Sequence, residues 1–137
     1  MKYDNGEGVI QDYKEAVKWY TKAAEQGKAS AQFNLALKYD KGEGVIQDYK
    51  EAVKWYTKAA EQGHASAQGN LGVMYANGEG VLQDNVYAHM WFNIASSNGS
   101  ENNRKNRDVV AEKMTPAQLA EAQKLARECV KRDYKNC

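Results

Sequence analysis

The chain has 137 residues, the usual length of one domain. Its 19 Lys and Arg residues nearly balance its 18 Asp and Glu residues, so the overall charge gives no sign of binding to nucleic acid or to an anionic membrane. Mean hydropathy is −0.82 and apolar runs are only a few residues long, so the sequence predicts no transmembrane helix.

The main feature of the sequence is an internal repeat. Residues 3–38 and 39–74 align without a gap and differ at only six positions. These are Asn5/Lys41, Lys28/His64, Phe33/Gly69, Ala36/Gly72, Leu37/Val73 and Lys38/Met74. A looser third copy starts at Tyr75 and fades after Gly99. Self-similarity at a period between about 20 and 50 residues predicts a solenoid, in which each unit buries its apolar face against its neighbours.

The chain begins in the middle of a unit. Tyr3 corresponds to Tyr39 and Tyr75, which we place near the end of a unit's first helix. We therefore expect either a fragment of a longer protein or a truncated first unit. The opening residues lack the apolar stretch of a signal peptide, but in a fragment the missing segment could have carried one. Periplasmic, secreted and cytoplasmic locations all stay open.

Each unit is predicted to contain two helices. Apolar residues recur with helical spacing from Ala67 to Tyr75, and Gly78-Glu79-Gly80 ends this first helix. The second helix begins after Asp12, Asp48 and Asp84 and ends at Gly27, Gly63 and Gly99. In the first two copies a glutamate follows the aspartate by three residues, a variant of the capping box. Trp19, Trp55 and Trp91 on the second helices are expected to fill the wedge between units.

The third copy differs from the first two on its second helix. The lysine stripes Lys14-Lys18-Lys22 and Lys50-Lys54-Lys58, which we expect on a solvated convex face, become Val86, Met90 and Ile94. We call these three apolar residues the ridge. An exposed ridge of this kind would be an interaction or aggregation patch.

A helix predicted near the end of the chain could cover the ridge. Thr115, Pro116 and Gln118 form a strong helix start, and the helix would place Leu119, Ala122, Ala126 and Cys129 on one face. We expect this helix to cap the solenoid by covering the ridge; the alternative is a homodimer through the same ridge. Residues 100–113 stand where a further first helix should be, and Val110 and Met114 can pack inward.

The two cysteines, Cys129 and Cys137, leave two possibilities open. A continuous helix would separate them by roughly 12 Å. A disulfide needs Cα atoms within about 7 Å, so a bond requires the helix to end near Lys131 and fold back. We expect two free thiols, with the disulfide as the alternative.

The repeat motifs carry a family resemblance. Ala-x-Ala-Gln-x-Asn-Leu-Gly-x-Met-Tyr (65–75), Gly-x-Gly-Val-x-Gln-Asp (78–84) and Ala-x-x-Trp-Tyr-x-x-Ala-Ala-x-x-Gly (52–63) resemble the Sel1-like repeat, a 36-residue relative of the tetratricopeptide repeat. Residues 113–128 are similar to the closing helix of bacterial Sel1-like proteins, which often place a tryptophan where this chain has Cys129.

The resemblance implies an all-α, right-handed α-solenoid of antiparallel helix pairs with a C-terminal capping helix. We expect a partial unit at 1–27, full units at 28–63 and 64–99, and a helical cap at 100–137, all in one domain. The resemblance also implies an interaction scaffold, although one cysteine-rich branch of the family has been linked to β-lactam binding or hydrolysis.

The sequence contains no recognisable catalytic, metal-binding or cofactor motif. It has no Ser-x-x-Lys, Gly-x-Ser-x-Gly, His-Glu-x-x-His, Cys-x-x-Cys or phosphate-binding loop. Of its two histidines, we expect His64 at the surface and His89 packed or half-exposed rather than acting as a ligand. No cysteine pair lies inside the repeats, which separates the chain from the branch linked to β-lactams.

The most promising surface is the concave side, which the first helices line in related helical-pair solenoids. The candidate partner-binding residues are Ser30, Phe33, Asn34, Leu37, Lys41, Ser66, Asn70, Val73 and Asn77. Asn34 and Asn70 could pair with the backbone of an extended peptide, or bond locally to the Gly-x-Gly loop. Phe33 could anchor a ligand or pack against the helix missing at the N-terminus.

These observations predict a non-enzymatic scaffold that binds a peptide or protein on its concave surface, with no cofactor. A monomer is favoured and a homodimer is possible, and we expect neither nucleic acid nor a membrane as partner. The alternative function is β-lactam binding or hydrolysis.

Overall fold

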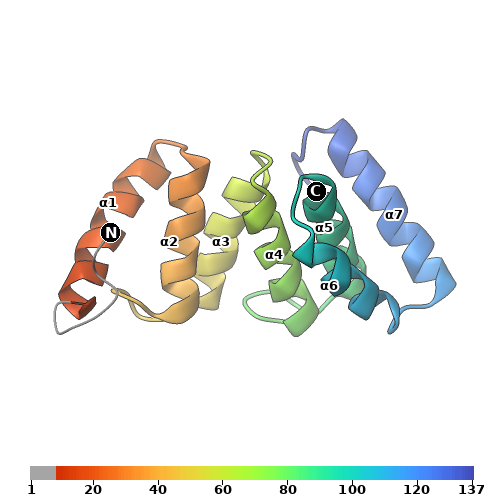
Figure 1. Cartoon of the computed structure of the whole chain (residues 1–137), viewed down its shortest axis with the longest axis horizontal. Coiled ribbons are helices and arrows are strands. Elements are labelled where there is room, and N and C mark those ends of the chain that lie inside the picture. The colour runs from red at the N-terminus through yellow and green to blue at the C-terminus, as the bar shows by residue number, and fades with distance from the viewer. Residues whose placement is uncertain (1–8) are drawn as a thin grey trace.

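The computed structural model of the protein describes residues 9–137, and this part of the chain forms seven α-helices and no strand. They are α1 (Val9–Glu25), α2 (Ala29–Lys41), α3 (Tyr49–Ala60), α4 (Ala65–Asn77), α5 (Asn85–Ser97), α6 (Asn102–Ala111) and α7 (Pro116–Lys131). Each of the first five helices packs against the next, and Figure 1 shows the helices following one another from α1 at one end to α7 at the other. The predicted all-α solenoid of helical repeats is confirmed. No described helix is both long enough and apolar enough to cross a membrane.

The loops between first and second helices depend on glycine. α2 and α4 end at Gly42 and Gly78, which take the left-handed conformation with φ of 71° and 69°. Two residues further on, Gly44 has a φ of 80° and its backbone lies against the carbonyl of Tyr13 in the preceding second helix, with no room for a Cβ. The Gly-x-Gly sequence therefore brings each loop into direct contact with the previous unit.

Two of the second helices, α3 and α5, start directly after their aspartates, as expected. The side chain of Asp48 accepts hydrogen bonds from the N–H groups of Lys50 and Glu51, and Asp84 caps α5 in the same way. The reciprocal half of the expected capping box is absent at α3, because the N–H of Asp48 donates instead to the carbonyl of Tyr39 at 2.9 Å.

The start of α1 differs from the expectation. This helix begins at Val9 and runs through Asp12, which is therefore not its N-cap. In the later units the loop before the helix is held by a bond from the aspartate N–H to Tyr39 or Tyr75. The corresponding tyrosine of the first unit, Tyr3, lies outside the described residues.

The three tryptophans do not all pack between units. Trp55 and Trp91 are buried, with 8% and 3% of their surface exposed, whereas Trp19 is 60% exposed. Trp55 lines one hollow together with Ala24 of the preceding unit and Gln32 of its own unit. The expectation for Trp19 is wrong because no helix precedes α1 in the described part of the chain to cover that face.

The last two helices close the described solenoid. Thr115 forms a complete capping box with Gln118, and α7 packs directly on α5. None of the ridge residues is exposed: Met90 and Ile94 are buried and Val86 is half-buried. Of the α7 residues expected to face the ridge, Ala122, Ala126 and Cys129 are buried and Leu119 is half-buried. Met90, Ile94, Ala126 and Cys129 belong to one continuous apolar cluster.

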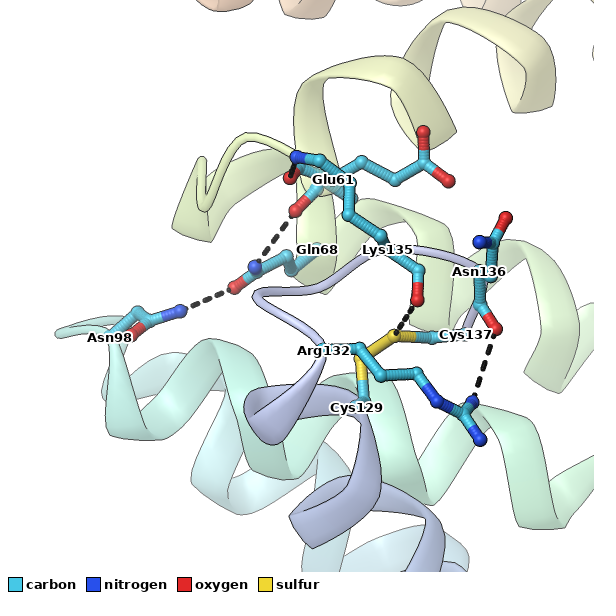
Figure 2. Close-up of a disulfide and its surroundings, with 9 residues drawn as sticks. Glu61, Gln68, Asn98, Cys129, Arg132, Lys135, Asn136 and Cys137 are labelled. Carbon is cyan, nitrogen blue, oxygen red and sulfur yellow. Dashed lines mark hydrogen bonds between the residues drawn. A yellow bond between two sulfur atoms is a disulfide. The ribbon is translucent and has the colours of Figure 1, made fainter.

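The expectation of two free thiols is wrong, because Cys129 and Cys137 form a disulfide, with Cα atoms 5.3 Å apart (Figure 2). α7 ends at Lys131 and the chain then turns back on itself. The reversal uses three non-glycine residues at positive φ, namely Asp133, Tyr134 and Asn136. The helix therefore stops early enough for the two cysteines to meet.

Candidate functional site

The nine residues predicted to bind a partner lie on α2 and α4 and all reach the surface. Ser30 and Lys41 of α2 and Ser66 and Asn77 of α4 are exposed. The others are half-buried: Phe33, Asn34, Leu37, Asn70 and Val73. These helices thus present polar side chains at their ends and partly apolar ones in the middle.

Part of this surface is hollowed between α4, α5 and α6. A cavity of about 230 Å³ is lined by Val73, Ala76, Asn77, Asn85, Phe92, Asn106, Val109, Val110 and Lys113. Only Val73 and Asn77 were among the predicted residues. Val109 was missed although it is 54% exposed. Val109 and Val110 are adjacent on α6, and Val110 is the buried one.

Asn70 is engaged inside the protein rather than pointing freely into a groove. Its amide donates to the hydroxyl of Tyr56 at 3.3 Å, and that hydroxyl donates to Asp40 at 2.9 Å. Burial, reinforced by the negative charge of Asp40, raises the pKa of Tyr56 and keeps the hydroxyl protonated. The chain of bonds links α4 to α3 and to the end of α2, and differs from the expected bond to the Gly-x-Gly loop.

The difference between Phe33 and Gly69 has a packing explanation. The ring of Phe33 stacks on His64 with centroids 4.8 Å apart and also lies against Tyr56. In the next unit a Cβ at Gly69 would overlap the side chain of Asn103 from α6. At the first of these contacts the larger side chain, Phe33, belongs to the earlier helix, α2. At the second contact the larger side chain, Asn103, belongs to the later helix, α6. Phe33 thus packs against His64 of the following unit.

His64 is more than a surface residue. It is half-buried, stands at the N-cap of α4, and its Nδ1 accepts a hydrogen bond from the N–H of Ala67 at 3.1 Å. Burial lowers the pKa of His64. The imidazole is therefore held neutral, which is the form that can accept this bond.

His89 is buried on α5. Among the described residues, its Nδ1 is the only buried side-chain nitrogen or oxygen without a hydrogen-bond partner. Burial lowers the pKa of His89; the positive charge of Arg107 lowers it further, and Asp108 opposes the change.

The described residues offer no other chemical centre. No group of three or more His, Cys, Asp or Glu side chains among them could hold a metal ion. The six stripe lysines are exposed, and Lys54 and Lys58 lie over the ring of Trp55, 5.0 and 5.8 Å from its centroid. Both cysteines are joined at the end of α7, outside the repeats, and nothing in the site supports the β-lactam alternative.

Comparisons with known proteins agree with this geometry. The Sel1 repeat family matches residues 3–28, 29–64 and 65–100. The crystal structure of c5321, a protective antigen of uropathogenic Escherichia coli with an SLR fold, is 38% identical with a TM-score of 0.88 over 91% of this chain. A Sel1 repeat protein from Oxalobacter formigenes is 36% identical with a TM-score of 0.69 over 93% of this chain. No curated protein sequence matches the chain.

The chain spans 28% of the Escherichia coli antigen and 59% of the Oxalobacter formigenes protein. Sel1 repeats generally mediate protein–protein interactions, and proteins built from them are typically non-enzymatic scaffolds. Because three consecutive matches run from residue 3 to residue 100, the chain belongs to the Sel1 repeat family.

Proposed function

We propose that this protein is a non-enzymatic scaffold that binds an extended segment of a partner protein on the surface of α2, α4 and α6. The observation that carries the proposal is the cavity between α4, α5 and α6, where apolar and amide side chains stand together. Such a cavity suits a peptide, because one apolar side chain can enter it while the neighbouring backbone meets hydrogen-bonding groups.

The lining of the cavity divides into three kinds of group. Val73 and Val109 offer apolar contact to a partner side chain. The amides of Asn77 and Asn106 can each donate and accept, as a peptide backbone requires. Lys113 adds a positive charge at the end of α6, so the partner segment is expected to be neutral or acidic there.

The rest of the predicted surface extends this site along α2. Ser30, Phe33, Asn34, Leu37 and Lys41 continue the binding surface one unit earlier. Asn70 supports the site by holding α4 against Tyr56, and its amide is less available to a ligand than we expected. The protein is proposed to act as a monomer, since α7 covers the ridge through which a dimer would have formed.

Selection of displayed random peptides on the immobilised chain provides the test. Peptides that bind are measured by calorimetry against the wild type and the Val109→Asp variant. Ile46→Asp is the control, because Ile46 is an exposed aliphatic residue, at 91%, that does not line this cavity. We expect Val109→Asp to weaken binding about tenfold or more, as for loss of a central apolar contact. Peptides that bind Val109→Asp as well as the wild type would contradict the proposal.

A further inference from the structure

A second hollow lies on the other side of the last units, between α5 and α7. Its volume is about 380 Å³, larger than that of the cavity beside α6. It is lined by Asn93, Ile94, Ser97, Ala126, Arg127, Val130 and Lys131. Its accessible surface is mostly apolar, and Val130 is exposed at its edge. We call this hollow the α5–α7 groove.

Val130 of α7 leaves an apolar side chain open to solvent beside the groove. Its neighbours Cys129 and Ala126 are buried against α5, yet Val130 remains 52% exposed at the edge of the groove. A helix that served only as a cap would be expected to carry a polar residue at such a position. Valine is instead an apolar contact left open beside a groove.

The charged residues that line the groove are both basic. Arg127 and Lys131 lie one turn apart on α7, and both are exposed. On the opposite side, Arg107 of α6 donates to Asn93 at 3.1 Å. Among the described residues that line the groove, none is acidic. Outside the lining, Glu128 follows Arg127 on α7, and Asp108 pairs with Arg107 at 3.2 Å.

We propose that the α5–α7 groove is a second docking surface, and that its occupant is an acidic amphipathic segment of a partner protein. An aliphatic side chain of the segment would fill the groove against Ile94 and Val130. Its carboxylates would face Arg127 and Lys131. Charge complementarity of this kind sets specificity more than affinity.

The same charges argue against two other occupants. A second copy of this chain, docked groove to groove, would place Arg127 and Lys131 against their own equivalents. A nucleic acid would find no aromatic side chain in the lining on which a base could stack. An acidic amphipathic segment can contact both the apolar side chains of the groove, Ile94 and Val130, and its basic side chains, Arg127 and Lys131.

Fluorescence anisotropy with two labelled synthetic peptides tests the proposal. Both are 15-residue helices with leucine on one face; the other face is glutamate in the first peptide and lysine in the second. The full chain should bind the glutamate peptide about tenfold or more tightly than the lysine peptide. In the first peptide the glutamates form favourable pairs with Arg127 and Lys131, whereas in the second the lysines are repelled by the same two residues. The preference should shrink at high salt.

Three variants locate the binding. Val130→Asp and the pair Arg127→Glu with Lys131→Glu should each weaken glutamate-peptide binding about tenfold. Val109→Asp, on the cavity beside α6, should leave it unchanged, so failure at one surface is distinguishable from failure at the other. The side chains at 127, 130 and 131 are exposed, so these variants are expected to fold, which circular dichroism checks. Equal binding of both peptides, no binding of the glutamate peptide, unchanged binding by Val130→Asp, or dimerisation of the chain through this groove would overturn the proposal.

Discussion

The hydroxyl of Tyr134 donates to the side-chain oxygen of Asn98 at 3.2 Å, and these residues are 36 positions apart, which is one repeat period. Asn98 donates in turn to Gln68 at 2.9 Å, as Gln62 donates to Gln32 at the same distance one unit earlier. These two bonds lie within the units 28–63 and 64–99, and Tyr134 joins the tail after α7 to the later one. The tail is folded back by the disulfide, and Lys135 donates to the carbonyl of Glu61 at the end of α3 (Figure 2).

Loss of the disulfide should destabilise the protein. The bond closes a loop between Cys129 and Cys137, eight positions apart, and loop entropy for such a loop is worth about 2–3 kcal/mol. The tail contacts of Tyr134 with Asn98 and of Lys135 with the carbonyl of Glu61 would loosen as well. Cys137→Ser should therefore lower the free energy of unfolding in urea, and so should reduction of the wild type. Dithiothreitol should not affect the variant; a wild-type midpoint insensitive to dithiothreitol would contradict this prediction.

Trp19 and Trp55 provide a matched pair from the repeat. Trp55 is 8% exposed and Trp19 is 60% exposed, although each is followed by the same Tyr-Thr-Lys-Ala-Ala sequence. Trp55→Ala should lower the free energy of unfolding by about 3–5 kcal/mol, because it removes a packed aromatic ring. Trp19→Ala should cost less than about 1 kcal/mol, since its surface is already largely in water. Chemical denaturation measures both; equal losses would mean that Trp19 is also packed.

The packing of Gly69 against Asn103 predicts strong coupling between these residues. A methyl group at position 69 would overlap the Asn103 side chain, which is held by Ser100 at 2.6 Å and by Asn106 at 3.2 Å. Gly69→Ala should therefore be at least about 1 kcal/mol less favourable in the wild type than in the Asn103→Ala background. In that background the helix propensity of alanine should make the change stabilising by up to about 1 kcal/mol. A double-mutant cycle by urea unfolding measures the coupling; additive effects would refute it.

The repeat could be read from the sequence because its signals are local. The glycine loops, Asp48, Asp84 and the Thr115 capping box act within a few residues of themselves, and each lies where the pattern places it. The burial of Met90 and Ile94 also followed from comparing copies of the same helix.

The features missed by sequence reasoning depend on distant contacts. No glycine marks the reversal at Asp133 and Tyr134, where the backbone takes positive φ and the disulfide holds the turn. Asn103 explains Gly69 only once α6 lies against α4. Val109 stands in a segment that has lost the repeat pattern, so no earlier copy showed on which side of the helix it lies.

His64 should make stability depend on pH. Its pKa in the folded state lies below the ordinary value because it is half-buried. The folded protein thus binds this proton less readily than the unfolded chain, so the stabilisation present above about pH 6.5 is lost as the pH falls through that value. His64→Asn keeps a capping side chain but does not titrate, and should flatten this dependence. Urea unfolding between pH 5 and 8 provides the check, and an unchanged slope in the variant would exclude His64 as a source.

His89 should reduce stability through its unpartnered Nδ1. His89→Val restores the residue found at Val17 and Val53, and should raise the free energy of unfolding at pH 8 by about 1–2 kcal/mol by removing a buried polar atom that lacks a bond. The gain should grow below about pH 6.5, because burial lowers the pKa of His89 and protonation favours the unfolded chain. His89→Gln separates the two effects, since it removes the titration but keeps a polar group that needs a partner. It should lose the pH dependence without the gain at pH 8. If His89→Val were less stable than the wild type at pH 8, the imidazole would be making a favourable contact that outweighs its missing hydrogen bond.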